Sequence, residues 1–435
     1  MSQQLRLPPV PGRIYHERAM IRKPLRVSRQ GAIRFLLEAQ HLRRGAMHDS
    51  PGTATAAVLK EIRHLECVQI DPVSVVERNQ HLVLAARLSG YLPQSLGELL
   101  RRRRVFEYWA NAACVVPVED YPLFEGTRRR YRKRLAPDLT ALRSVVRHVL
   151  AELEAHGPLA ARTFVSDHRV RGAWDLSDPK TKATSHALSL LLKVGDIIVV
   201  RREGIERHFD LPERALPVDL LERARTFSAA DADELMLEKY LRAYRVFDAG
   251  DPRFGWRAMT AAARRDVLQR RVRGGNVIPL IIEGVRRHYF VRGEDGPALE
   301  RHERAAKSET TLGDEAPMHF LAPLDNLLWR RNRISDLFGF EYTWEVYLPV
   351  PKRRYGHYAM PILFGDRFVG RLDPQLDRGR GRLGIRLLQL EPRVRMTMRL
   401  RKALRAALES FARFHGATDL QIGRTIPAGL RRMLP

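Results

Sequence analysis

Two copies of one short pattern, a helix followed by a basic hairpin, limit the possible folds of this chain more than any other feature. Residues 185–211 contain the first copy and residues 260–292 the second. Each hairpin turn reads Glu-Gly and then (Ile/Val)-x-Arg-His-(Phe/Tyr), with Gly204 and Gly284 in equivalent places. Glycine supplies the positive φ that a tight hairpin turn needs. The repeat is typical of tandem winged helices, a fold widely used on DNA, and chance similarity between two common hairpins is the alternative.

The second strand of each hairpin is basic, and it is predicted over Ile205–Phe209 and over Val285–Tyr289. Basic side chains on such a strand are placed to meet phosphate oxygens, which receive most of the polar contacts between proteins and DNA. A solvated strand without a ligand is the competing interpretation. The DNA contacts predicted in the two hairpins are Arg207, His208, Arg287 and His288.

The part of the chain before the repeat divides into a tail and a helical region. Residues 1–27 combine several prolines with many charges and no sustained period, which is typical of a flexible basic tail. From Ser28 the pattern is helical, with amphipathic segments over 54–65 and 75–88, and a helix followed by a β-rich stretch over 95–116. This order also fits a winged helix. The predicted domains are therefore the tail at 1–27, winged helices at 28–137, 138–228 and 229–315, and a C-terminal domain at 316–435.

Past Met318 the sequence becomes rich in short strands. They are predicted over Tyr342–Leu348, Tyr358–Leu363, Phe368–Leu372 and Leu383–Leu390, with glycines between them. A closing helix is predicted over Met396–Phe414. We therefore expect an α+β protein whose winged helices are followed by a C-terminal antiparallel β-domain. The basic aromatic hairpin tip at 352–357 is either a plain solvated turn or a DNA contact made by Lys352, Arg353 and Tyr355.

The charge balance favours a polyanionic partner. The 435 residues carry 76 Lys+Arg against 50 Asp+Glu, a formal net charge of +26. Each basic side chain that meets a phosphate releases counterions from DNA, so this surplus favours nucleic acid, although a GC-rich genome also inflates arginine. Cys67 and Cys114 are the two cysteines, too few for a Cys-rich metal site, and they fit a reducing cytoplasm. We expect no metal, no cofactor and no membrane span, and the absence of a heptad run favours a monomer.

The segment from Leu65 to Pro72 is the one whose residues suggest a catalytic site. Its apolar neighbours predict a buried, extended connector between two helices, and Pro72 disfavours a helical conformation at Asp71. In an extended chain, Gln69 and Asp71 point to the same side. A buried amide and a buried carboxylate cost free energy unless they are satisfied, so the pair is either a structural device or a site. The structural alternative is that Asp71 caps the next helix.

Further blocks of residues follow this motif in a definite order. They are Val68–Val73, Arg78, Leu82–Leu84, Arg87-Leu88, Tyr91, Glu107–Ala110, Ala113-Cys114, Ala322–Asp325, Trp329, Arg331, Pro351–Arg353, Tyr355-Gly356 and Val369–Asp373. In order and spacing, over about residues 28–430, the blocks resemble the bacterial AlkZ/YcaQ-like DNA glycosylases. The resemblance implies tandem winged helices arranged around a DNA-binding cleft, followed by a β-domain. It also implies excision of alkylated purines, chiefly N7-alkylguanine, and unhooking of interstrand crosslinks.

The resemblance also implies roles for single residues. The catalytic signature of the family is Gln-x-Gln or Gln-x-Asp, and Gln69 and Asp71 have the second form, which places the chain nearer the YcaQ branch and its broader range of alkylated guanines. An N7-alkylated guanine is already a good leaving group. Asp71 is therefore predicted to stabilise an oxocarbenium-like sugar and to activate water, and Gln69 to position water or nucleotide. Lys60 is the one lysine near the motif, so a monofunctional enzyme that leaves an abasic site is expected.

Among the matching residues, three arginines are predicted to contact DNA: Arg78, Arg87 and Arg371. The chain also departs from the family pattern. Relatives commonly carry Ser-His-Tyr or Ser-Pro-Tyr where this chain has Asn79, Gln80 and His81, and a His or a Lys where it has Asn111 or Gln375. These departures bear on lesion preference, because a lost His or Lys removes a DNA contact.

The expected protein is thus a repair enzyme that acts on double-stranded DNA in the cytoplasm, on the nucleoid. The alternative is a non-enzymatic winged-helix transcriptional regulator or a binder of unusual DNA structures. Under that alternative, removal of Asp71 lowers stability by about 1 kcal/mol and has no catalytic phenotype.

Overall fold

The structure is a computed structural model that describes residues 23–44, 54–172, 175, 178–308 and 316–433. These residues form two compact units. Of the described residues, the first unit contains 54–67 and 92–240, and the second contains 23–44, 68–91 and 241–433. Both mix helices with small sheets, as the sequence predicts. No helix among the described residues is long and apolar enough to cross a bilayer. The predicted domain limits at 137, 228 and 315 stay predictions.

The first unit is mainly helical. Its helices are α2 (Ala54–Leu65), α4 (Pro93–Arg101), α5 (Glu125–Ala141), α6 (Arg143–His156), α7 (Ala183–Val194), α8 (Pro212–Ala215), α9 (Val218–Thr226) and most of α10 (Ala229–Tyr244). Its strands β3 (Val105–Trp109) and β4 (Ala113–Pro117) pair antiparallel, and β5 (Leu159–Ala160), β9 (Glu206–Asp210) and β8 (Ile198–Glu203) form a sheet in that order. The short strands β6 (Arg169–Val170) and β7 (Thr181–Lys182) pair with each other. Helix α7 ends at Gly195 in the left-handed conformation, and its apolar residues form a buried core.

The second unit draws its helices from distant parts of the chain. They are α1 (Arg29–Ala39), α3 (Asn79–Ala85), the last turn of α10, α11 (Ala261–Arg273), α12 (Gly296–Ser308), α13 (Arg331–Phe338) and α14 (Met398–Phe414). Strand β2 (Val68–Gln69) precedes α3. Helix α1 begins at Ser28, whose hydroxyl accepts a hydrogen bond from Gly31 N, as expected of an N-cap.

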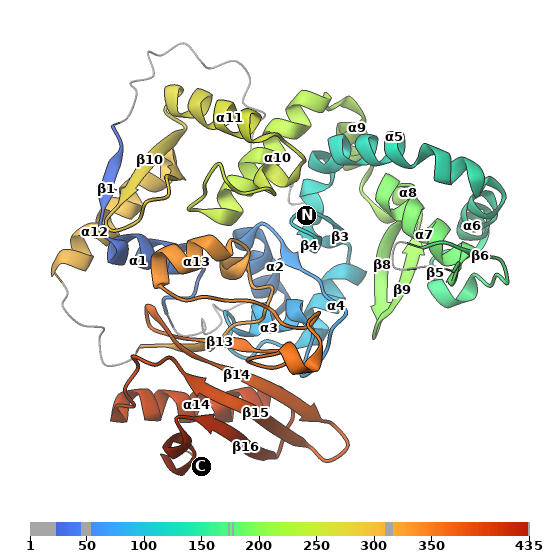
Figure 1. Cartoon of the computed structure of the whole chain (residues 1–435). Helices are drawn as coiled ribbons and strands as arrows, with labels where there is room; N and C mark the ends of the chain where they lie inside the picture. The colour runs from blue at the N-terminus through green and yellow to red at the C-terminus, as the bar shows by residue number, and fades with distance from the viewer. Residues whose placement is uncertain (1–22, 45–53, 173–174, 176–177, 309–315, 434–435) are drawn as a thin grey trace. The chain divides into compact units, whose positions relative to one another are not determined.

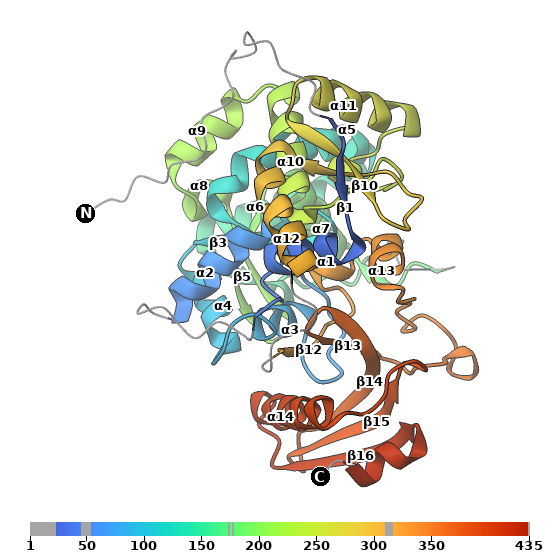
Figure 2. The same cartoon turned by 90° about the vertical axis from the view of Figure 1, so that its left-hand side faces the viewer.

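Two sheets organise the second unit. The smaller sheet has the order β1 (Leu25–Val27), β10 (Val277–Ile282), β11 (Tyr289–Arg292), and β1 is parallel to β10 (Figure 1). The larger has the order β12 (Met318–Phe320), β13 (Met360–Phe364), β14 (Arg367–Asp377), β15 (Arg382–Leu390), β16 (Asp419–Ile426). Figure 2 shows α14 lying along this sheet, and its Leu400, Leu404 and Leu408 are buried.

Both copies of the predicted helix-and-hairpin repeat are present. Helix α7 leads into the β8–β9 hairpin, and α11 leads into the β10–β11 pair. Gly204 and Gly284 have φ values of +60° and +69°, the conformation for which glycine was expected at these turns. The second strand of the second copy is shorter than predicted, because β11 begins at Tyr289 and residues 285–288 form a loop.

Several expectations for single elements are wrong. The tail does not extend to residue 27, because Leu25–Val27 is a strand of the smaller sheet; residues 1–22 lie outside the described part. The predicted helix over 75–88 is limited to Asn79–Ala85, because the carbonyls of Val75 and Val76 accept bonds from Leu376 N and the Arg378 guanidinium.

The C-terminal sheet also differs from its prediction in two ways. Residues 342–348 are not a strand, so 352–357 is a loop after a short 3₁₀ turn rather than the tip of a hairpin. The sheet is not wholly antiparallel, because the unpredicted strand β16 joins β15 in parallel after the crossover helix α14.

Candidate active site and nucleic-acid contacts

The Gln-x-Asp motif lies on an extended segment between α2 and α3, as its sequence predicts. Strand β2 ends at Gln69, which is only 7% exposed. The chain then continues as a loop to Arg78. The backbone oxygen of Gln69 accepts a hydrogen bond of 2.8 Å from the side-chain amide of Asn79. The backbone that carries this catalytic candidate is thus fixed from the start of α3.

Asp71 is half-buried, so its carboxylate is neither sealed inside the fold nor fully hydrated. Burial raises the pKa of Asp71, and a hydrogen bond from Val73 N to Asp71 Oδ1, at 2.9 Å, offsets part of that rise. The proposal that Asp71 caps the next helix is wrong, because α3 begins eight residues later with Arg78 as its N-cap. Asp71 closes a local turn instead, through the bond that its Oδ1 accepts from Val73 N.

The loop that follows Asp71 is attached to the larger sheet of the same unit. Leu376 N donates to Val75 O at 3.4 Å, and Arg378 Nη2 donates to Val76 O at 2.7 Å. Both donors lie at or just past the end of β14. Nothing in the sequence near the motif indicates this attachment, since about 300 residues separate its two sides.

Two predicted DNA contacts flank α3 and have different surroundings. Arg78 is half-exposed at the start of the helix. Arg87 is 0% exposed, and its guanidinium makes two bonds of 2.7 and 2.9 Å with the carboxylate of Asp325. The prediction that Arg87 contacts DNA is therefore corrected: it is one half of a buried ion pair. Asp325 also caps the following 3₁₀ turn, because its Oδ1 accepts from Leu327 N at 2.9 Å.

The first hairpin carries two predicted DNA contacts, of which one is half-buried and the other is buried. Arg207 is half-buried, and its guanidinium lies 5.2 Å from the centre of the Phe209 ring. His208 is only 4% exposed, and its Nδ1 lies 3.0 Å from the Arg201 guanidinium. The expectation that His208 reaches DNA does not fit this buried position.

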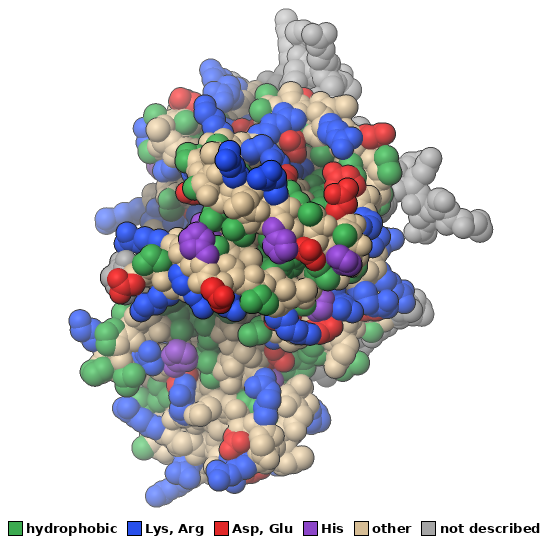
Figure 3. Space-filling model, turned by 90° about the vertical axis from the view of Figure 1, so that its right-hand side faces the viewer, with side chains coloured by type: hydrophobic (Ala, Val, Ile, Leu, Met, Phe, Trp, Pro, Cys, Tyr) green, Lys and Arg blue, Asp and Glu red, His purple; other side chains and the backbone are tan. Residues whose placement is uncertain are grey.

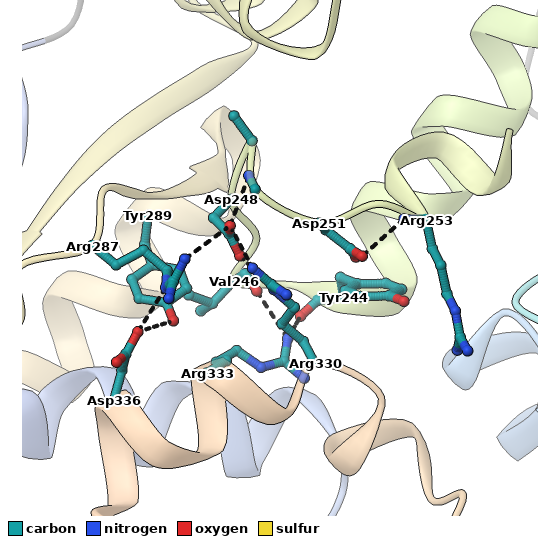
Figure 4. Close-up of polar contacts among 12 residues, drawn as sticks. Tyr244, Val246, Asp248, Asp251, Arg253, Arg287, Tyr289, Arg330, Arg333 and Asp336 are labelled. Carbon is teal, nitrogen blue, oxygen red and sulfur yellow. Dashed lines mark hydrogen bonds and ion pairs between the residues drawn. The ribbon is translucent and has the colours of Figure 1, made fainter. Parts of the chain in front are cut away.

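In the second hairpin, Arg287 takes part in a network of polar contacts. Its Nε lies 2.9 Å from Asp336, and its Nη1 lies 3.8 Å from Asp248, which also receives two bonds from Arg330 (Figure 4). Tyr289 donates its hydroxyl to Asp336 at 2.7 Å. The network fixes the base of the hairpin, yet a third of the Arg287 side chain stays exposed.

Arg287 and the exposed His288 also line a cavity of about 680 Å³ between α11 and the hairpin. Its floor is apolar, and three further polar side chains of α11 reach it. The apolar lining includes Leu268, Val272, Pro279 and Phe290; the polar side chains of α11 are Arg265, Gln269 and Arg273. Arg265 and Arg273 are exposed and were not among the predicted contacts, although the high charge of their helix was visible in the sequence.

The basic loop 352–357 is shaped by one buried carboxylate. Glu345 accepts hydrogen bonds from three successive backbone N–H groups, those of Arg354, Tyr355 and Gly356, at 3.1, 2.8 and 3.1 Å. Lys352 is exposed, whereas Arg353 is half-buried and donates to Leu348 O.

Arg371 lies under the same loop. It is 2% exposed, and its guanidinium lies 3.8 Å from the centre of the Tyr355 ring and bonds to Glu391 at 2.8 Å. Its prediction as a DNA contact is corrected, because it supports the half-buried Tyr355 from inside the fold.

The positions that depart from the family pattern also separate by burial. Gln80 and Asn111 are buried, while His81 is half-buried and its Nδ1 lies 2.8 Å from the Tyr91 hydroxyl. Gln375 is exposed on β14. Over the described ranges, no group of three or more His, Cys, Asp and Glu side chains is arranged to hold a metal ion. Cys67 and Cys114 are both fully buried.

Comparison with known proteins places these features in a family. The chain is similar to a solved structure of the Streptomyces sahachiroi DNA glycosylase AlkZ, with a TM-score of 0.59 over 92% of this chain and 100% of that one. The sequence identity is 16%, so this likeness concerns the fold. The family model "DNA glycosylase AlkZ-like" matches residues 62–414, which include the Gln-x-Asp motif, α11 with its hairpin and the larger sheet as far as α14. The chain therefore belongs to the AlkZ-like DNA glycosylase family.

Proposed function

We propose that this protein is a monofunctional DNA glycosylase that hydrolyses the N-glycosidic bond of N7-alkylguanine and related alkylpurines. We include interstrand crosslinks that join two such bases, which would be unhooked by the same reaction. The observation that carries the proposal is Asp71, a half-buried carboxylate with a raised pKa, two residues after the buried Gln69. Membership of the AlkZ-like family supports the reaction class.

The chemistry needs little more than a carboxylate and a held water molecule. Alkylation at N7 places a positive charge on the guanine, so the base leaves as a neutral molecule without help from a general acid. As the bond between C1′ and N9 breaks, positive charge develops on the sugar, and the Asp71 carboxylate stabilises it. Water adds its oxygen to C1′ and passes a proton to Asp71. The raised pKa of Asp71 makes the carboxylate a stronger base than an ordinary aspartate, and the Gln69 amide is the group that orients water or nucleotide.

The surroundings of Lys239, one lysine of the first unit, exclude that side chain as a Schiff-base nucleophile. A Schiff-base step requires an uncharged, accessible amine. Lys239 is fully buried, and its ammonium contacts Glu66 at 2.9 Å and Asp120 at 2.5 Å, which raise the pKa of Lys239 despite its burial. It is therefore held charged. The expected product is an intact abasic site.

We further propose that the helix-and-hairpin copies are winged helices and that their exposed cations bind the DNA backbone. Lys and Arg side chains are spread over the face shown in Figure 3. The proposed contacts within the copies are Arg207, Arg287 and His288, together with Arg265 and Arg273 on α11. Outside the copies, the proposed contacts are Arg78 and the loop residues Lys352, Arg353 and Tyr355. The cavity beside α11 joins three of these arginines and His288 to an apolar floor, a combination that suits phosphate and deoxyribose.

The test is base release from duplex DNA that contains a single N7-methylguanine. The wild type is expected to release the free base and to leave alkali-labile abasic sites without cutting the strand. Asp71→Asn, which keeps the shape and removes the charge, is expected to lower the single-turnover rate constant by about 100-fold or more. A duplex crosslinked between two N7 positions is expected to be converted to two single strands.

Release at the wild-type rate by Asp71→Asn would overturn the proposed mechanism. Strand cutting that accompanies base release would overturn the monofunctional assignment. No release from any alkylated duplex, together with tight binding to one undamaged sequence, would favour the non-enzymatic regulator.

A further inference from the structure

The amide side chain of Asn79 makes contacts on two sides at the start of α3. Its Nδ2 donates to Gln69 O at 2.8 Å, and its Oδ1 accepts from Leu324 N at 3.1 Å. Nδ2 also lies 3.5 Å from Leu324 O. Asn79 is only 1% exposed, so water competes little for these bonds. A single buried side chain therefore joins the backbone of the catalytic motif to a chain segment 245 residues away.

The segment that Asn79 holds is itself firmly fixed. Leu324 O accepts from the indole Nε1 of Trp329 at 3.0 Å. The next residue, Asp325, forms the buried ion pair with Arg87, in which both side chains are 0% exposed. Arg87 also donates to Gln40 O and to Val83 O, at 2.9 and 3.0 Å. The segment is thus bonded to Asn79 at the start of α3 and to Arg87 just after its end, and neither attachment is free to shift alone.

We infer that Asn79 is a positioning residue for the glycosylase reaction, which sets the place of the Gln69 peptide and so of the side chains of Gln69 and Asp71. This inference rests on the proposed function. Asn79 does not act on the substrate; it acts through the Gln69 carbonyl. Asp71 already has its own local restraint in the bond from Val73 N, so Asn79 supplies the restraint on the other side of the motif. Displacement of reacting groups by about 1 Å costs up to about 100-fold in rate.

The hydrogen-bonding groups of the amide explain why side chains of similar size cannot replace Asn79. Aspartate keeps an oxygen for Leu324 N but loses the hydrogens that bond to Gln69 O. Leucine has a similar volume and loses both bonds. Serine keeps a hydroxyl, but that oxygen lies one bond closer to the helix backbone than the amide nitrogen does.

The experiment measures single-turnover base release from N7-methylguanine duplex by the full-length wild type and by Asn79→Leu, Asn79→Asp and Asn79→Ser. The matched control is Thr184→Val in the first unit, because Thr184 is 2% exposed and its hydroxyl also donates to a backbone oxygen, Phe164 O, at 2.9 Å. For each variant, the amplitude reports the folded, active fraction and the rate constant reports positioning. The DNA dissociation constant is measured in parallel.

All three Asn79 variants are expected to lower the rate constant by about tenfold or more and to change the DNA dissociation constant by less than about twofold. Thr184→Val is expected to lose thermal stability and to keep the wild-type rate constant. Wild-type rate constants in the Asn79 variants, with an active wild type, would overturn the positioning role alone. A loss confined to DNA affinity would also overturn it. An inactive wild type would overturn the proposed function, and the positioning role with it.

Discussion

Arg78 and Arg87 lie at the two ends of α3, and their surroundings show how differently one residue type is used. Arg78 is half-exposed before the helix, whereas Arg87 is fully buried against Asp325. The sequence could not separate them, because the partner of Arg87 lies 238 residues away. His208 and Arg371 were also misjudged, although their partners are closer in sequence: Arg201 is 7 residues from His208, and Glu391 is 20 residues from Arg371. Their burial depends on tertiary packing, which a local pattern does not display. By contrast, Gln69 and Asp71 could be singled out as candidates, since a polar pair within a short apolar segment is visible locally; their catalytic role stays a prediction.

Asp71 is expected to reduce stability at neutral pH in exchange for its reactivity. Because its pKa is raised in the folded state, the folded protein binds the proton more tightly than the unfolded chain does. The contribution of Asp71 to the free energy of unfolding is therefore greatest below its unfolded pKa of about 3.9 and is lost as pH rises through the raised folded pKa. Asp71→Asn should melt at a higher temperature than the wild type at pH 7, although we propose that it loses catalytic activity.

Thermal melts of Asp71→Asn and wild type at pH 7 and at the lowest pH that both tolerate will check this. The increase in melting temperature of Asp71→Asn over the wild type should be smaller at the lower pH. Asp266→Asn, at an exposed aspartate of α11, is the control. An unchanged or lower melting temperature for Asp71→Asn at pH 7 would contradict the expectation.

At the scale of elements, hairpins with Glu-Gly turns were predictable and the segment 342–348 was not. Gly204 and Gly284 determine their turns through local backbone conformation, which a sequence displays directly. Residues 342–348 alternate like a strand, but Glu345 uses its carboxylate to order the loop 354–356. The parallel pairing of β16 was also beyond local inference, because it depends on the crossover by α14.

The loop 352–357 requires glycine at position 356. Gly356 has a φ of +114°, and a Cβ there would lie 2.1 Å from Asp373 Oδ2. Asp373 cannot move freely, since it accepts from Tyr358 N at 2.9 Å and pairs with Arg386 at 2.9 Å. Gly356→Ala is therefore expected to displace the basic loop and to weaken DNA binding by about tenfold.

The matched control is Gly379→Ala, in the turn after β14, where a Cβ has only Asp377 Oδ1 nearby, at 3.6 Å. This variant should bind DNA like the wild type. Fluorescence anisotropy with an undamaged duplex measures both affinities. Equal affinities for Gly356→Ala and Gly379→Ala would show that the loop shape does not matter for binding.

At the scale of the whole molecule, the net charge of +26 was the most direct sequence indication of a DNA partner. Many of the arginines are nevertheless occupied by carboxylates, as in the pairs of Arg330 with Asp248 and of Arg202 with Glu107. The count of basic residues thus overstates the charge that is available to phosphate. The exposure of Arg265 and Arg273 in the structure, more than the number of basic residues in the sequence, identifies them as candidates for DNA binding.

The salt dependence of DNA binding provides a test of that surface. Each cation that contacts a phosphate adds about 1 to the slope of log K against log salt concentration. Arg265→Gln and Arg273→Gln are each expected to reduce the slope by about 1. Arg405→Gln removes an exposed arginine of α14 and controls for net charge. Equal reductions in all three variants would mean that the cavity beside α11 is no special contact.

The parallel pairing of β1 with β10 has a consequence for biosynthesis. Leu25 has Leu280 as its partner, so β1, the first strand of the described residues, must wait for more than half of the chain to be synthesised. At about 5–20 residues per second, that delay is on the order of ten seconds or more. During it, the first unit can complete its own core, whereas the second cannot close until synthesis nears the carboxyl end. Premature termination before residue 280 would leave β1 and α1 without their partners, as a target for proteolysis.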